Sequence, residues 1–355
     1  MAAVFPAVPL RPLRRAAETG QAFALAQLLR WTWRPTVDVL GGRVDVRLLR
    51  LALEAGTRLV PGAPLQPSLS RRPELITGVG GNDGLSAEWT IPRQPVEGAA
   101  VLYLHGGAFA FGSARTHRTL TGALAAESDL RVLAPSYRLA PEHPSPAALE
   151  DAQAAFRFLE ATGIPAGRIV VAGDSAGAYL ATLLVAQRCA AALPAPAGVV
   201  LFSPWLDLGC AALSDADHRC RDPFVSPNAA KRLGRLYADA AAGQVAELCP
   251  GRPDGSSSGG SDGSDHGHDA ARGAPYLIQV GGLESLAPGA REFSRTLTNA
   301  GFDCTLETWP GQIHVFQAMH PWLPAARRAM RRAGQFARER ALAAEGYEGA
   351  EGYEG

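Results

Sequence analysis

The sequence is poor in lysine, in cysteine and in long apolar segments. Lys231 is its single lysine, and the chain as a whole carries 34 basic and 34 acidic side chains with a net charge of zero. Nothing in this balance favours binding to nucleic acid or to an anionic surface. The five cysteines are odd in number and include no Cys-x-x-Cys pair. Neither a disulfide framework nor a zinc site is therefore indicated.

Membrane and export signals are also lacking. No apolar run reaches the roughly 18 residues needed to span a bilayer. Pro6, Pro9 and Pro12 interrupt the N-terminal segment, so it contains no signal-peptide core. Residues 1–17 are rich in arginine and nearly free of acids, and a transit peptide is an alternative interpretation of them. A cytoplasmic protein is the expectation.

One short motif is the most informative feature that the chain does have. The pentapeptide Gly-Asp-Ser-Ala-Gly at residues 173–177 follows an apolar run at 168–172 and precedes a helix-like stretch at 179–192. A serine between a strand and a helix, on a sharp turn, is typical of a nucleophile elbow. The glycines on either side of Ser175 let neighbouring backbone approach a turn that side chains would block. Ser175 is the predicted nucleophile.

A glycine pair upstream predicts a second part of the same site. Residues 101–104 are typical of a buried strand, and His-Gly-Gly follows directly at residues 105–107. Backbone N–H groups in such a loop, together with the amide that follows the nucleophile, can bind a developing oxyanion. We expect the amides of Gly106, Gly107 and Ala176 to form this oxyanion hole. The alternative is that the two glycines only make a tight turn.

A catalytic base is expected among the histidines that follow Ser175. His314 lies in a loop directly after the strand-like residues 304–309, and a loop after a late strand is where the base belongs in such a fold. A buried histidine with a purely structural role is the alternative. The remaining candidates are His218, His266, His268 and His320.

The third member of the predicted triad is an acid between the serine and the histidine. Residues 275–280 form a strand-like apolar run, and Glu284 is the only carboxylate near its end. Its side chain would accept the Nδ1–H of His314 and stabilise the imidazolium. An ordinary surface glutamate is the alternative. The chain order Ser175, Glu284, His314 is the nucleophile–acid–histidine order of α/β-hydrolases.

Several further motifs accompany this order. The run Tyr-Arg-Leu-Ala-Pro-Glu-His-Pro-Ser-Pro-Ala-Ala-Leu-Glu-Asp at residues 137–151 is the most specific, since chance would rarely assemble it. The others lie at residues 105–108, 173–177, 203–208 and 284–286. With them the chain resembles the hormone-sensitive-lipase-like branch of the α/β-hydrolases (bacterial esterase family IV) over about residues 85–340. The resemblance implies a serine carboxylesterase with the triad and oxyanion hole above, and no metal or cofactor.

The chain departs from the family pattern at several positions, of which two belong to the predicted site. Ala108 stands where many relatives have a third glycine, and because only backbone is used there we expect little effect. Glu284 stands where relatives often carry aspartate. Because glutamate is longer by one methylene group, the loop that carries it must retreat slightly.

Alternating apolar strands and helices predict an α/β-hydrolase fold, with a mostly parallel sheet, helices on both faces and a helical cap. We expect an N-terminal helical cap segment at residues 1–80, a catalytic domain at 81–343 and a disordered repeat tail at 344–355. Within the domain, residues 209–242 contribute to the cap. Residues 251–273 are rich in Gly, Ser and Asp and form a predicted disordered insertion.

The individual elements follow the same periodicity. Strands are expected near residues 85–91, 99–104, 130–135, 168–172, 199–203, 276–280 and 304–309. Helices are expected near residues 22–33, 46–55, 118–128, 146–162, 175–192, 288–300 and 321–344.

The expected function is hydrolysis of a small short-acyl carboxylic ester through an acyl-enzyme. Aromatic residues that could line an apolar substrate pocket, or simply pack in the core, are Phe109, Phe111, Trp205 and Phe224. A lactone hydrolase, or an acetyl hydrolase of a secondary metabolite, is the second interpretation. A non-catalytic small-molecule receptor is the third. Since relatives often pair through their last strand, the resemblance also implies a homodimer through residues 303–309.

Overall fold

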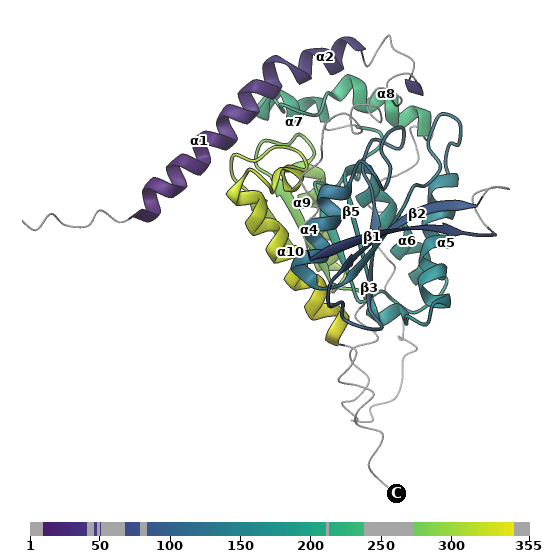
Figure 1. The fold of residues 1–355 in the computed structure, drawn as a ribbon. Helices are drawn as coiled ribbons and strands as arrows, with labels where there is room; N and C mark the ends of the chain where they lie inside the picture. The colour runs from purple at the N-terminus through teal and green to yellow at the C-terminus, as the bar shows by residue number, and fades with distance from the viewer. Residues whose placement is uncertain are drawn as a thin grey trace, which may run out of the picture.

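A mixed sheet of eight strands forms the centre of the structure (Figure 1). The computed structural model describes residues 10–40, 46–47, 50, 68–78, 84–210, 213–237 and 273–343. The strand order is β1-β2-β4-β3-β5-β6-β7-β8. The strands are β1 Leu69–Ile76, β2 Leu85–Pro92, β3 Ala100–Leu104, β4 Arg131–Pro135, β5 Ile169–Asp174, β6 Gly198–Phe202, β7 Tyr276–Gly281 and β8 Cys304–Trp309.

Strand direction places several loops at one edge of the sheet. β2 is antiparallel to β1 and to β4, whereas all the other neighbouring pairs are parallel. The carboxyl ends of the parallel strands therefore meet at a common edge, which is where open α/β sheets bind ligands. The loops that follow β3, β5, β6, β7 and β8 all begin there.

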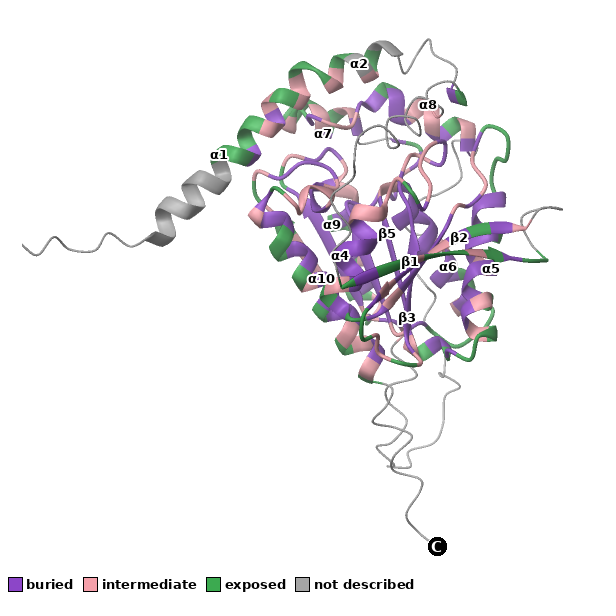
Figure 2. Cartoon of the chain, in the orientation of Figure 1, coloured by how far each residue is buried: buried purple, intermediate pink, exposed green. Residues whose placement is uncertain are grey.

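Four of the parallel strands, β3, β5, β6 and β7, are buried on both faces because their side chains alternate between two apolar clusters. In β3, Leu102 and Leu104 face one cluster, while Val101 and Tyr103 face the other. Figure 2 shows β3 and β5 as buried throughout. This continuous burial explains why such short runs are recognisable in the sequence as apolar strands without polar alternation.

Helices cover both faces of the sheet. α5 (Ala147–Ala161), α6 (Ser175–Ala190) and α9 (Ala287–Asn299) supply side chains to the first cluster. α4 (Arg118–Ser128) and α10 (Pro324–Ala343) supply side chains to the second. The predicted architecture, a mostly parallel sheet between two helical layers, is confirmed.

Four helices from two distant parts of the chain lie together beyond the sheet, and we call them the cap (Figure 1). They are α1 (Leu10–Trp31), α2 (Trp33–Leu40), α7 (Leu213–Cys220) and α8 (Pro227–Tyr237). α8 contacts both α2 and α7. The expected cap contribution at residues 209–242 thus contains two helices in its described part.

Most predicted elements coincide with observed ones to within a few residues. The strand predicted at residues 304–309 is β8, and the helix predicted at residues 118–128 is α4, both with the expected bounds. The later helices α9 and α10 also begin and end close to their predicted limits. Apolar periodicity was sufficient to locate these elements in the sequence, because each packs one or both of its faces against the core.

One strand was missed. Residues 69–76, which the sequence analysis assigns to the N-terminal helical segment, form β1 and pair antiparallel with β2. Only the first and last residues of β1 are buried, and its interior contains Pro73 and two arginines. A proline and charges are compatible with an edge strand, where one side of the backbone needs no partner. The same composition conceals the strand in the sequence.

Two expectations lie largely or wholly outside the described residues, namely the insertion at 251–273 and the repeat tail at 344–355. Across the described ranges, none of the helices combines the length and apolarity that crossing a bilayer requires. Within the same ranges, no group of three or more His, Cys, Asp or Glu side chains is arranged to hold a metal ion.

Candidate active site

Ser175 lies at the sharp turn between β5 and α6. Its φ is +50°, a left-handed conformation that non-glycine residues rarely adopt. A Cβ added to Gly177 would overlap the carbonyl oxygens of Leu104 and His105, and one added to Gly173 would overlap Gly177. The two glycines therefore let β3 and the start of α6 approach closely, as the motif predicts. The turn presents the serine hydroxyl at the carboxyl edge of the sheet.

His314 comes to this edge from the loop after β8. Its Nε2 lies 3.1 Å from the Oγ of Ser175, within hydrogen-bond reach. The imidazole is almost completely buried, with 6% of the residue exposed. The other described histidines after Ser175, His218 and His320, form no contact with that hydroxyl. The structure thus brings the predicted base and the predicted nucleophile together.

Glu284 comes from the loop after β7 and lies on the far side of the imidazole. Its Oε2 is 3.2 Å from Nδ1 of His314. Its Oε1 accepts hydrogen bonds from the hydroxyl of Ser203, at 2.6 Å, and from the amide of Gly281. The residue is only 3% exposed, so protein donors take the place of water as the hydrogen-bond partners of the carboxylate. Glutamate fits the site despite its extra methylene group.

Ser203, at the end of β6, joins the acid to the histidine loop. Its hydroxyl donates to Glu284 and accepts the amide hydrogen of Val315 at 2.9 Å. Its φ of +47° is again left-handed. This serine belongs to the family motif at residues 203–208, but the motif alone predicts no separate role for it. Its position directly after a parallel strand was the available signal, because such positions face the same edge of the sheet.

Buried charges around the imidazole favour its protonated form. Burial on its own lowers the pKa of His314, but the hydrogen bond and charge of Glu284 act in the opposite direction, assisted by Asp222 and Asp174. The pKa of His314 is therefore raised above the 6.5 of an ordinary histidine. An imidazolium that forms when Ser175 loses its proton is stabilised by the same charges.

Asp174, the second residue of the pentapeptide, anchors the glycine-rich loop. Its Oδ1 accepts hydrogen bonds from the amide of Gly106 at 2.9 Å and from the hydroxyl of Tyr103 at 2.7 Å. Its Oδ2 lies 3.5 Å from Nε2 of His117. Burial raises the pKa of Asp174, but His117 and the hydrogen bonds outweigh burial, so the pKa is lowered overall. An ionised carboxylate therefore ties the loop after β3 to the elbow.

The expectation that the Gly106 amide faces an oxyanion is wrong, because that amide donates to Asp174. The next two amides, those of Gly107 and Ala108, donate to no acceptor in the part of the chain that the structure describes. Both residues have positive φ, +117° and +53°. The amide of Ala176 is also available, since it lies in the first turn of α6, where helical N–H groups have no partner within the helix.

The aromatic residues predicted to line a pocket have different surroundings. Phe109 is fully buried and stacks on Tyr237, with ring centroids 3.9 Å apart. Trp205 is also buried, and its ring centroid lies 5.9 Å from that of Phe109. These two side chains pack mainly on each other and on their aromatic neighbours.

Phe224 lies close to the reacting groups. Its ring centroid is 5.6 Å from that of His314 and 5.3 Å from that of Trp33 in the cap. Phe111 is half-buried in the loop after Gly107. Of the four predicted aromatic residues, Phe224 is the one that contacts the imidazole.

This arrangement is suited to nucleophilic acyl transfer. A serine hydroxyl touches a buried imidazole whose other nitrogen faces a carboxylate, and free backbone amides flank the serine. Such a set can activate the hydroxyl, accept its proton and bind the oxyanion of a tetrahedral intermediate.

Known proteins resemble the chain in sequence. A family model described as alpha/beta hydrolase fold matches residues 101–318. An acetyl-hydrolase from Streptomyces hygroscopicus is 40% identical over 253 residues, which cover 71% of this chain and 79% of that protein. The carboxylesterase/phospholipase LipF from Mycobacterium tuberculosis is 36% identical over 242 residues, covering 68% of this chain and 62% of that one.

Solved structures agree with these similarities. An esterase from the bacterial hormone-sensitive lipase family superposes with a TM-score of 0.73 at 30% identity, covering 92% of this chain and 98% of that one. EstE5, in crystals soaked with p-nitrophenyl butyrate, superposes with a TM-score of 0.73 at 29% identity, covering 92% and 99% of the two chains. The chain therefore belongs to the hormone-sensitive-lipase-like family of ester hydrolases, which have the α/β-hydrolase fold.

Proposed function

We propose that the chain hydrolyses carboxylic esters with short acyl chains through an acyl-enzyme on Ser175. The observation that carries this proposal is the continuous contact from Ser175 Oγ to His314 Nε2, at 3.1 Å, and from His314 Nδ1 to Glu284, at 3.2 Å. Nucleophile, base and acid are all buried or half-buried at one edge of the sheet. This is the geometry that a serine hydrolase needs before its substrate arrives.

Acylation begins when His314 takes the proton of Ser175 as the serine oxygen attacks the ester carbonyl. The positive imidazolium is stabilised by Glu284, which keeps the correct tautomer by accepting the Nδ1 hydrogen. His314 then protonates the leaving alcohol. In deacylation, the neutral imidazole activates a water molecule that attacks the acyl-enzyme, and the acid product leaves.

The amides of Gly107, Ala108 and Ala176 are the proposed oxyanion donors. Gly106 is replaced in this role by Ala108, because the Gly106 amide is used by Asp174. Each donor of this kind contributes about 10²–10³ in turnover. Asp174 would then act indirectly, by holding the loop that carries Gly107 and Ala108 against the elbow.

The size of the acyl group is inferred from the surroundings of the imidazole and from the relatives. Phe224 places an apolar ring beside His314, and we propose that it contacts the substrate. One relative is named an acetyl-hydrolase, and another is named an ethyl acetate hydrolase. These names favour a small acyl group and keep acetyl-ester hydrolysis of a secondary metabolite as the second candidate. Rates on acetyl, butyryl and octanoyl esters and on lactones distinguish these possibilities.

Replacing the nucleophile tests the proposal directly. We expect Ser175→Ala to lower kcat for p-nitrophenyl butyrate by at least about 10⁴-fold, because no other hydroxyl contacts His314 among the described residues. Labelling by a fluorophosphonate should be lost with it. Ser70→Ala, on the exposed edge strand, is the matched control and should retain both activities. Turnover retained by Ser175→Ala would show that another group is the nucleophile, and a wild-type chain that resists labelling would favour the receptor interpretation.

The rate should depend on pH through His314. Only the neutral imidazole can take the serine proton, so kcat/KM should fall about tenfold per pH unit below its pKa. Because the pKa of His314 is raised, the midpoint of this acid limb should lie above 6.5. A pH series measured in buffers of constant ionic strength checks the midpoint, with recovery of activity at neutral pH as the control for unfolding. A midpoint near 5 would contradict the assigned role of Glu284.

Asp174 should affect both stability and rate. Asp174→Ala leaves the Gly106 amide and the Tyr103 hydroxyl buried without an acceptor, which costs about 1–3 kcal/mol for each group. We expect a lower free energy of unfolding and a fall in kcat of about tenfold or more. Asp174→Asn keeps one acceptor oxygen, so its stability and its kcat should lie between those of the wild-type chain and those of Asp174→Ala. Denaturant titration and steady-state kinetics measure the effects, and equal behaviour of all three chains would disprove the anchoring role.

We also propose a homodimer through β8. This strand is one of the two edges of the sheet, and most of its side chains are only half-buried. An unpaired parallel edge offers backbone groups that a second copy can pair with. Light scattering on the full chain at micromolar concentration should give twice the mass of one chain, and the mass of a single chain at every concentration would exclude the dimer.

A further inference from the structure

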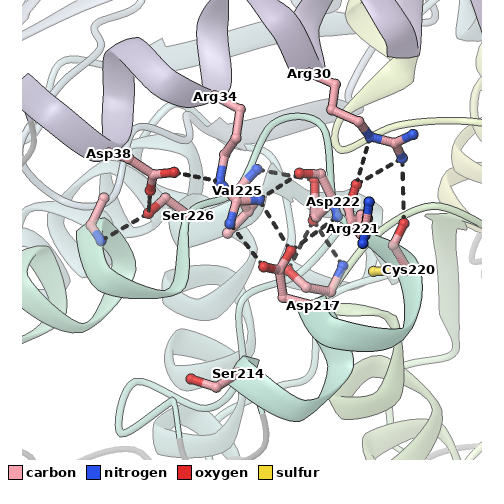
Figure 3. A network of polar contacts seen from close by, with 12 residues as sticks. Arg30, Arg34, Asp38, Ser214, Asp217, Cys220, Arg221, Asp222, Val225 and Ser226 are labelled. Atoms are coloured by element: carbon pink, nitrogen blue, oxygen red, sulfur yellow. Dashed lines mark hydrogen bonds and ion pairs between the residues drawn. The ribbon is translucent and has the colours of Figure 1, made fainter.

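The loop between α7 and α8 forms hydrogen bonds with two different parts of the chain. Residues 221–226 connect the two helices, and Figure 3 shows the cap side chains that converge on them. The N-terminal helices bind one side of this loop, and the segment that carries Glu284 binds the other. Asp222 lies between the two sides and is completely buried, at 0% exposure.

Arginines of the N-terminal helices α1 and α2 bind the loop and the end of α7 that precedes it. Two nitrogens of Arg34 bind the two carboxylate oxygens of Asp217, at 2.8 and 3.1 Å, in a bidentate pair. Nη1 of Arg34 also donates to the carbonyl oxygen of Asp222 at 2.6 Å. Arg30 donates to the carbonyl oxygen of Arg221 at 2.8 Å. The backbone around Asp222 is thus held by residues nearly 190 positions earlier in the chain.

The carboxylate of Asp222 is shared between the loop and the catalytic domain. Its Oδ1 accepts the amide hydrogens of Phe224 and Val225 at 2.8 and 3.0 Å, which closes the turn of the loop itself. Its Oδ2 accepts the amide hydrogen and the hydroxyl hydrogen of Ser285 at 2.8 and 2.9 Å. One oxygen therefore serves the cap and the other serves a segment 63 residues away.

The segment that Asp222 binds is the one that carries the proposed catalytic acid. Ser285 follows Glu284 directly in the chain. The same loop also places the ring of Phe224 against His314 and, on its other side, against Trp33. One short cap segment therefore contacts His314 directly and binds the residue next to Glu284.

We propose that Asp222 is a positioning residue, which couples the placement of the cap to the placement of Glu284 and His314. The proposal rests on the proposed catalytic function of these two residues. The side chain of Asp222 binds Phe224, Val225 and Ser285 rather than the nucleophile, and it acts on the triad through Ser285. Its place in the loop makes the docking of α1 and α2 part of the same arrangement.

The chemistry of the contacts explains why a carboxylate is needed. All four side-chain partners of Asp222 are donors: three backbone amides and one hydroxyl. A carboxylate can accept at both oxygens, whereas an amide side chain accepts at only one. A residue that merely closed its own turn would need the Oδ1 contacts alone. The Oδ2 contacts with Ser285 have no function in the turn.

The charge of Asp222 also acts on the imidazole. The charged groups that face His314 are Glu284 from the loop after β7, Asp174 from the end of β5, and Asp222 from the cap, and all three raise the pKa of His314 against the effect of burial. Removing the charge at position 222 therefore lowers the pKa of His314. The acid limb of the rate profile reports this change, which a purely structural residue would not produce.

Asp222→Asn is the principal test. It keeps an oxygen for the Phe224 and Val225 amides but loses the acceptor for Ser285. We expect kcat for p-nitrophenyl butyrate to fall about tenfold or more with little change in KM, since the positioned groups act on the transition state. The acid midpoint of kcat/KM should move to lower pH, and the rate of fluorophosphonate labelling should fall with kcat.

Two further variants separate position from charge. Asp215→Asn removes the same charge from an exposed site on α7 and should leave kcat and the acid midpoint unchanged. Ser285→Ala removes one of the two Oδ2 contacts and keeps the charge. It should lower kcat less than Asp222→Asn does and leave the acid midpoint in place.

The outcomes distinguish this proposal from the proposed function. A folded Asp222→Asn chain with wild-type kcat, labelling rate and acid midpoint overturns the positioning role. If that variant does not fold, unchanged kcat in Ser285→Ala overturns it instead. A wild-type chain that is not labelled at Ser175 overturns the proposed catalytic function, whatever the variants do.

Discussion

A buried carboxylate at the end of β7 determines the arrangement of the proposed triad. Glu284 is only 3% exposed, so its charge is tolerated only because donors surround it. Those donors come from three strands: Gly281 ends β7, Ser203 follows β6, and His314 follows β8. Moving any of these loops would remove one of the donors of a buried charge, which makes the positions of the three loops mutually dependent.

The same physical solution occurs at two other places around the site. Asp174 accepts hydrogen bonds from the loop after β3, and Asp222 accepts them from its own turn and from Ser285. Each carboxylate is buried, and each joins segments that lie far apart in the sequence. Secondary structure therefore brings the loops to one edge of the sheet. Hydrogen bonds to the buried carboxylates then fix the positions of these loops relative to one another.

Elements that obey a simple local rule could be predicted from the sequence. The strands β3, β5 and β7 are short apolar runs because both faces of the parallel sheet are covered. The elbow was predictable because only glycine fits at positions 173 and 177, where added side-chain atoms would overlap backbone. β1 was not predictable, since it is an edge strand whose charged and proline-containing interior carries neither a helical nor an alternating pattern.

The role of Gly106 shows why a motif alone does not identify a donor. His-Gly-Gly predicts free amides after β3, but which of them is free depends on the neighbour that takes one. That neighbour is Asp174, 68 residues away, and its selection requires the parallel pairing of β3 with β5. Long-range partners of this kind leave no periodic trace in the sequence, and the Asp222–Ser285 contact was missed for the same reason.

The cap has two tasks that depend on the same few residues. Phe224 lies beside the imidazole, where an apolar ring contacts substrate in the proposed function, and two positions earlier Asp222 binds the segment that carries the acid. The amide of Phe224 is itself bound by Asp222, so the backbone that carries the ring cannot move without disturbing that carboxylate. Because binding and positioning share one loop, a change there that adapts the site to a larger acyl group also displaces Glu284. Substrate selectivity and turnover are therefore expected to vary together when residues 221–226 vary.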